Sequence, residues 1–290
     1  MTSSRRFLFV QFEFPWVLGP EPGRYTIRER LGEPPAHILV LGTLGAAERR
    51  LLLVRRRARE APAEPPAMPV PTTRATLVDT AALAGREAAE QRLGEADLDA
   101  LAQEALARLN RVLHAHRVAV ADPYAREVAR EQALVVRVGY GDGERVAEGR
   151  WDRARELPAL ARTARGARGR SAALRPQERL AAVLGGRDAV LASEELALRA
   201  RCDVDAGRLR EAALQLRVAF EAALAELEAW RDMPGLGPRL LGLREQRDDV
   251  AAAANAALRG GLDEQHIETV RTVLAGVEAA LRARTAGERL

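Results

Sequence analysis

A pair of histidines near the middle of the chain is the pattern with the clearest potential for chemistry. His114 and His116 form an H-x-H motif, and Asp122 follows shortly after it. On a β-strand this spacing places both imidazoles on one face, where they could bind a divalent metal with the carboxylate as third ligand. On a helix the two rings point roughly 200° apart. Because an apolar helical stripe runs up to Leu113, we predict a helix, and a metal-dependent enzyme is the less favoured alternative.

Arginine is concentrated in a segment that contains no acidic residue between Glu156 and Glu178. Its arginines are Arg162, Arg165, Arg168, Arg170 and Arg175. Such a segment can lie along phosphates and bind them with an affinity that falls as salt rises. No aromatic residue interleaves to stack on bases, so a solvated linker over 159–175 is the favoured interpretation. Nucleic acid or another polyanion is the alternative partner.

The chain contains no lysine, so its 45 basic residues, against 41 acidic ones, are all arginines. Schiff-base catalysis and a P-loop are therefore excluded, because both need a lysine amine. Guanidinium groups stay protonated, and the small excess of charge is enough to explain a pI near 10.0. No further motif predicts a catalytic residue or a cofactor, and we favour a non-catalytic protein.

The single cysteine and the N-terminal residues both indicate in which cellular compartment the protein is expected. Cys202 cannot form an internal disulfide, and its place one helical turn after Leu198 predicts a buried, unreactive thiol. The first residues resemble the start of a twin-arginine export signal, but Gln11 and Glu13 interrupt the apolar stretch that such a signal requires. No apolar run reaches the ~20 residues of a membrane span. We expect a cytoplasmic protein that does not contact a membrane.

Alternating apolar residues predict a β-rich N-terminal part over 1–60, forming a small sheet or barrel. Residues 7–14, FLFVQFEF, alternate as a strand does and carry an unusually apolar second face. Shorter alternating segments predict strands over 24–28, 37–44 and 49–59. The following segment, 61–72, is rich in proline and lacks apolar periodicity, which predicts an extended linker and a domain boundary.

A mixed α/β segment is expected over 73–158. It begins with a predicted strand over 72–78 and continues with an amphipathic helix over 96–113, whose apolar residues recur at steps of three and four. Asp122 before Pro123 is typical of a helix start and predicts a short helix to about Gln132. The hairpin predicted over 134–151 turns at Gly141-Asp142-Gly143 and returns through Val146.

The residues over 176–290 predict a helical domain. An αα-hairpin is expected over 193–230, with Gly207 at its turn. The last helix carries a short heptad seam of apolar residues at steps of three and four: Ile267, Val270, Leu274, Val277 and Leu281. The seam is too short to be stable alone, so it must pack either on the chain's own helices or on a second molecule.

These patterns predict an α+β protein with a β-rich N-terminal part, a mixed central part containing a helix and a β-hairpin, and a mainly helical C-terminal part. Our leading functional hypothesis is a non-catalytic interaction or assembly protein. Its helical C-terminal surfaces, with the heptad seam as the candidate interface, would bind a protein partner or a second copy of the chain.

Overall fold

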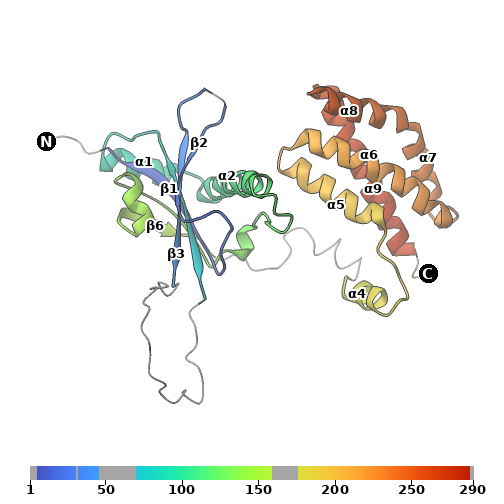
Figure 1. Cartoon of the computed structure of the whole chain (residues 1–290), viewed down its shortest axis with the longest axis horizontal. Helices are drawn as coiled ribbons and strands as arrows, with labels where there is room; N and C mark the ends of the chain where they lie inside the picture. The colour runs from blue at the N-terminus through green and yellow to red at the C-terminus, as the bar shows by residue number, and fades with distance from the viewer. Residues whose placement is uncertain (1–4, 31, 46–69, 159–175, 288–290) are drawn as a thin grey trace, which may run out of the picture. The chain divides into compact units, whose positions relative to one another are not determined.

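The computed structural model of the chain describes residues 5–30, 32–45, 70–158 and 176–287. The chain divides into two compact units, Met1–Thr163 and Ala164–Leu290. The described part of the first unit holds a β-sheet with helices, and residues 176–287 of the second unit hold helices (Figure 1). The predicted α+β class, with strands in the N-terminal half and a mainly helical C-terminal part, is therefore confirmed.

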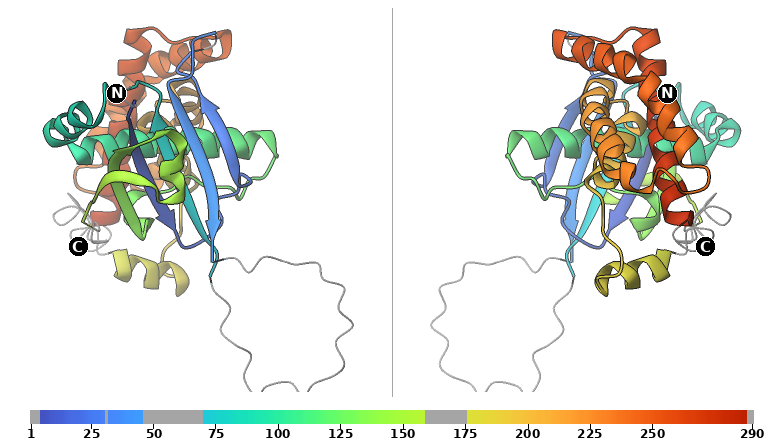
Figure 2. Two further views of the ribbon diagram at one scale, coloured as in Figure 1. Left: turned by 90° about the vertical axis from the view of Figure 1, so that its left-hand side faces the viewer. Right: turned by 90° about the vertical axis from the view of Figure 1, so that its right-hand side faces the viewer.

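The described strands of the first unit form one antiparallel sheet in the order β2-β3-β4-β1-β5-β6. The bounds of its strands are β1 Phe7–Phe14, β2 Gly23–Ile27, β3 His37–Leu44, β4 Thr72–Asp79, β5 Val135–Gly141 and β6 Trp151–Glu156. Figure 2 shows the strands side by side, with β2 and β6 towards opposite edges. The sheet is open in the described part of the chain, so of the two predicted forms, sheet or barrel, it is the sheet.

Strand β1 lies inside the sheet and buries side chains on both of its faces, as its apolar alternation predicts. Val10 and Phe12 belong to the main core of this unit, which also contains buried residues of α1 (Arg86–Glu95) and α2 (Leu98–Ala119). On the opposite face Phe9 packs in a smaller cluster with Val146. Two helices on one face and a short loop helix on the other therefore cover the centre of the sheet.

Strand β4 joins the two segments that the sequence places on either side of the proline-rich stretch. It pairs with β3 over eight residues and with β1 on its other side, so residues before and after 46–69 share one sheet and one core. The boundary predicted at 61–72 therefore does not separate two folding units, because each of β3 and β1 needs β4 to satisfy its backbone hydrogen bonds. The predicted strand over 49–59, and the linker except its last residues, lie outside the described residues.

The predicted hairpin exists, but its second strand is displaced along the sequence. After β5 the chain forms the 3-10 helix η2 (Gly143–Glu148), and β6 begins only at Trp151. The Gly-Asp-Gly turn signal suggests an immediate reversal, yet Val146 is fully buried on the sheet next to Phe9. Burial of this valine on the second face of the sheet favours a longer connection.

The segment after α2 is a turn where the sequence predicts a helix. Asp122 accepts a hydrogen bond from the backbone N–H of Tyr124 at 2.9 Å, which is an Asx turn and no helix start. Only Arg130–Gln132 is helical, as the 3-10 turn η1. Ala121, which directly follows the C-cap of α2, has a φ of 54°, a left-handed conformation that glycine adopts far more readily.

We expect Ala121→Gly to stabilise the chain by up to about 1 kcal/mol, because glycine relieves the steric strain of a left-handed alanine. Ala121 is exposed, so the substitution removes no buried contact. Urea titration followed by circular dichroism measures the change. As the matched control, Gly260→Ala, at a φ of 116° after α8, should destabilise the helical unit. A less stable Ala121→Gly variant would contradict the prediction.

The described part of the helical unit contains six α-helices, and the last five of them contribute buried residues to one apolar core. Their bounds are α4 Pro176–Leu184, α5 Ala192–Asp205, α6 Leu209–Glu226, α7 Gly237–Glu245, α8 Arg247–Arg259 and α9 Glu264–Gly287. The predicted αα-hairpin corresponds to α5 and α6, joined at Gly207 with a φ of 73°. Phe220 of α6 is the largest apolar side chain of this core, and it is fully buried.

No helix in the described ranges of the chain combines the length and the apolar character that crossing a membrane requires.

Candidate functional site

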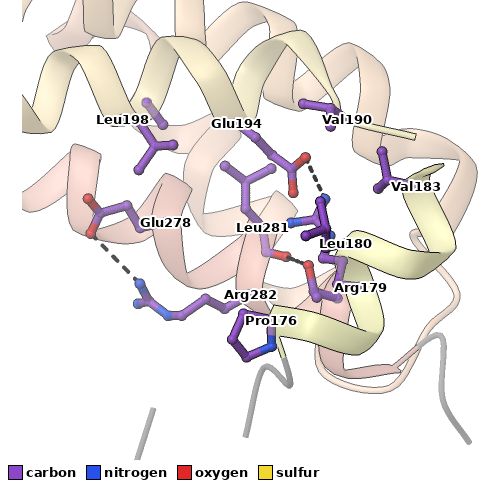
Figure 3. Close-up of a pocket in the computed structure, with 12 residues that line it drawn as sticks. Pro176, Arg179, Leu180, Val183, Val190, Glu194, Leu198, Glu278, Leu281 and Arg282 are labelled. Carbon is purple, nitrogen blue, oxygen red and sulfur yellow. Dashed lines mark hydrogen bonds and ion pairs between the residues drawn. The ribbon is translucent and has the colours of Figure 1, made fainter. Parts of the chain in front are cut away.

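An open apolar groove with a volume of about 560 Å³ lies between α4, α5 and α9 of the helical unit. Its apolar lining comes from these helices and from the loop between α4 and α5: Leu180, Val183, Val190, Ala197, Leu198 and Leu281 (Figure 3). Leu180 is 51% exposed and Leu198 is 66% exposed. Single exposed leucines are common on protein surfaces, but several around one hollow indicate a binding site. We call this feature the helical groove.

Helix α4 forms one wall of the helical groove and contributes no buried side chain to the unit. Leu180, Val183 and Leu184 follow the spacing of one helix face, so the helix is amphipathic. Short helices depend on burial of such a face for their stability. The apolar face of α4 is thus left incompletely covered by the described residues of its own unit.

Arg179 holds α4 against the rest of the unit through two carboxylates. Its Nε lies 3.2 Å from Oδ2 of Asp188, in the α4–α5 loop, and its Nη2 lies 2.7 Å from Oε2 of Glu194 on α5. Asp188 also accepts a hydrogen bond from Arg284 of α9 at 2.6 Å. The guanidinium of Arg284 in turn stacks over the ring of Trp230, 4.6 Å from its centroid. One ionic network therefore joins the elements that form the helical groove.

Burial and hydrogen bonding act in opposite directions on this network. Burial by itself raises the pKa of Asp188, but hydrogen bonds from Arg284, the backbone N–H of Ala189 and Arg179 outweigh it and hold the pKa below its usual range. The pKa of Arg179 is raised, chiefly by its hydrogen bond to Glu194. Asp188 and Arg179 are consequently both charged at neutral pH.

The charged residues at the opposite edge of the helical groove are also paired. Glu278 of α9 forms a two-pronged ion pair with Arg201 of α5, at 2.8 and 3.1 Å. Arg282 lies 3.8 Å from Glu278 one helical turn further on (Figure 3). Because these charges already have partners, a ligand of the helical groove gains affinity mainly by covering apolar side chains.

The heptad seam of the last helix packs internally. Val270, Leu274 and Val277 are fully buried in the core of the helical unit, and Leu281 is nearly so, at the floor of the helical groove. Ile267 is partly buried. The sequence left two alternatives for the seam, packing on the chain's own helices or on a second molecule. The structure shows the first, because α9 packs against α5, α6, α7 and α8. Four of the five candidate interface residues, all except Ile267, are therefore core residues, a correction to their assignment as a contact surface.

The histidines of the H-x-H motif lie on α2, as the helical stripe predicts. Nδ1 of His114 lies 4.0 Å from Oε1 of Glu127. The ring of His116 lies instead against Gly19, where an added Cβ would be 3.1 Å from two imidazole atoms. Asp122 follows the end of the helix and lines a separate hollow in the sheet unit. Among the described residues no cluster of three or more His, Cys, Asp and Glu side chains is arranged to hold a metal.

Two other sequence predictions have different outcomes. The arginine-rich segment over 159–175, with all five candidate polyanion-binding arginines, lies outside the described residues, so polyanion binding stays a prediction. Cys202 is exposed, which contradicts the buried thiol expected from its place after Leu198. The reason is that Leu198 itself is exposed at the helical groove, so the helical turn that they share does not face the core.

The candidate site residues that the sequence patterns did not single out are those of α4 and the ionic network. Their only local signal is the spacing of Leu180, Val183 and Leu184, a stripe that looks the same whether it is buried or open. The pairing of Arg179 with Asp188 and Glu194 has no sequence signature. No family model, no curated protein and no solved structure matches the chain. The site is therefore interpreted from its own geometry.

Proposed function

We propose that the chain is a non-catalytic interaction protein whose helical groove binds an amphipathic α-helix of a partner protein. The observation that carries the proposal is the set of exposed apolar side chains gathered around one open groove, Leu180, Val190 and Leu198 among them. A helix presents apolar residues at steps of three and four, which suits a groove that is itself formed by helices. Such a partner helix would cover the apolar face of α4 that the described residues leave exposed.

The size of the expected effect follows from the apolar side chains. Complete burial of a large, fully exposed apolar side chain contributes roughly 1.5–3 kcal/mol to the free energy of binding. The apolar side chains of the groove are already partly buried, so each contributes less than this. Ordering the partner and fixing its orientation oppose binding. A dissociation constant in the micromolar range, on the order of 10⁻⁶ M, is the balance that we expect.

The proposal is tested with the double variant Leu180→Asp/Leu198→Asp and the matched control Leu241→Asp/Leu258→Asp, whose leucines are exposed outside the groove. Tagged wild-type chain and both variants are used to capture proteins from cells that produce the chain. We expect at least one protein that the wild type and the control retain and the groove variant loses. That protein, purified, should bind the wild-type chain in calorimetry and not the groove variant. Identical captured sets for all three chains would overturn the proposal.

A further inference from the structure

The apolar face of α4 extends beyond the helical groove that it borders. Of the described helices in its unit, α4 alone buries no side chain, whereas each of the other five contributes to the core. Leu180 and Leu184 lie four positions apart on one face of α4, and they are 51% and 78% exposed. Leu184 does not line the groove of its own chain. The chain therefore carries, beside its groove, an uncovered helix of the kind that the groove is proposed to bind.

The dimensions of the helical groove suit a short helix that inserts one face. The nine residues of α4 span about 13.5 Å at roughly 1.5 Å per residue. A cylinder of that length and ~10 Å width occupies about 1,000 Å³. The groove, at about 560 Å³, accepts the side chains of one face of such a helix and not its backbone. Because Leu180 and Leu198 reach the groove from different helices, the inserted face contacts both walls (Figure 3).

A two-fold contact between two copies of the chain lets each α4 occupy the groove of the other. Since α4 is itself a wall of its groove, two antiparallel α4 helices that lie side by side are in both grooves at once. Neither helix has to leave its own unit, where Arg179 pairs with Asp188 and Glu194. The same contact covers Leu184, which a ligand confined to the groove leaves exposed.

The apolar surface that this contact covers is sufficient for a weak dimer. Four large side chains of α4 and the groove are 51–78% exposed: Leu180, Leu184, Val190 and Leu198. Complete burial of one such side chain covers roughly 100 Å², so two copies cover about 500 Å² of apolar surface. With ~60% of an interface apolar, the total is about 850 Å². Stable interfaces begin at about 1,200 Å², so the dimer is transient and of micromolar strength.

We propose that the partner of the helical groove is a second copy of this chain, and that the two copies exchange their α4 helices. The inference rests on the function proposed for the groove and names its partner. Leu184 of each copy lies in the groove of the other, beside Leu198. The charges at the edge of the groove stay in their own copy, because Glu278 is already paired with Arg201.

The first test is the mass of the full chain by light scattering between about 0.1 and 100 µM. We expect it to rise from monomer to dimer with a midpoint in the micromolar range. Leu184→Asp should weaken dimerisation at least about tenfold, because it places a carboxylate on the inserted face. The matched control is Leu258→Asp, whose leucine is 67% exposed on α8 outside the groove. A wild-type chain that stays monomeric, or equal dimerisation of the two variants, overturns the exchange.

A mixing experiment tests whether α4 of one copy enters the groove of the other. Leu184→Asp damages the inserted helix, and Leu198→Asp damages the groove. Each variant alone has both contacts of its dimer damaged. In an equal mixture of the two, one of the two contacts contains no substitution, so the mixed dimer should form about tenfold more tightly than either variant alone. A mixture that associates no better than the separate variants overturns the reciprocal arrangement.

The result is distinguishable from that of the capture experiment on the helical groove. If the exchange is correct, the protein that tagged wild-type chain retains, and Leu180→Asp/Leu198→Asp loses, should be the untagged chain itself. If that protein is a different one and the wild-type chain stays monomeric, the exchange of α4 is wrong while the helix-binding function of the groove stands.

Discussion

Leu274→Asp is expected to unfold the helical unit, lowering its free energy of unfolding by about 5 kcal/mol or more. Leu274 is fully buried on α9, in the apolar cluster that also contains Phe220 of α6 and Ala257 of α8. The substitution removes the contacts of a core leucine and places a carboxylate among apolar side chains. Because a whole domain is typically stable by only ~5–15 kcal/mol, the loss removes most or all of the stability of this unit.

Circular dichroism at 222 nm during a urea titration measures the effect of Leu274→Asp. The matched control is Leu258→Asp, at an exposed position near the end of α8, which should change the stability by no more than ~0.5 kcal/mol. A Leu274→Asp chain that keeps wild-type stability while its mass by light scattering falls would contradict the internal packing. It would make the heptad seam a contact between molecules after all.

Asp188→Asn is expected to destabilise the helical unit by about 3–5 kcal/mol, because it removes the carboxylate that accepts a hydrogen bond from the buried Arg284. Arg284 is only 2% exposed and Asp188 only 10%, so water replaces the lost partner poorly. Arg179 loses one of its two carboxylates at the same time. Since Arg179 holds α4, the variant should also loosen the wall of the helical groove.

The same variant changes how stability depends on pH. The pKa of Asp188 is lowered in the folded chain, because hydrogen bonds from Arg284, Ala189 and Arg179 outweigh the effect of burial. A group with a lowered folded pKa stabilises the fold above its unfolded pKa, and this stabilisation is lost as pH falls through the folded pKa. The difference in unfolding free energy between wild type and Asp188→Asn should therefore be constant near neutrality. It should shrink on acidification below about pH 4.

Asp232→Asn is the control for the charge change alone, since its side chain is 96% exposed and its ion pair with Arg231 is a surface contact. Unfolding free energies of the three chains between neutral and acid pH provide the measurement. If Asp188→Asn and Asp232→Asn have the same free energy of unfolding at neutral pH, the buried ionic network does not stabilise the helical unit. The conclusion that this network holds α4 at the groove would then be wrong.

Local pattern was sufficient for the elements whose periodicity is unbroken. The alternation of residues 7–14 predicted β1, and the stripe running into Leu113 predicted a helix that carries both histidines, as α2 does. Pattern was insufficient where one particular contact, whether near or distant in the sequence, decides the path of the backbone. Val146 is buried against the sheet and delays the return strand to Trp151. Asp122 binds the backbone of Tyr124 and turns the chain where a helix start was expected.

The sequence by itself determined the α+β class, the αα-hairpin around Gly207 and the need of the last helix for a packing partner. It could not say which apolar faces are covered, because an amphipathic stripe has the same spacing against its own core and against another molecule. Only the tertiary structure placed Leu274 inside the core and left Leu180 and Leu198 open. Likewise, strand alternation is local, but the pairing of β4 between β3 and β1 brings together residues that are 28 to 69 positions apart in the sequence. The fold and the candidate site thus depend on long-range packing that no local pattern encodes.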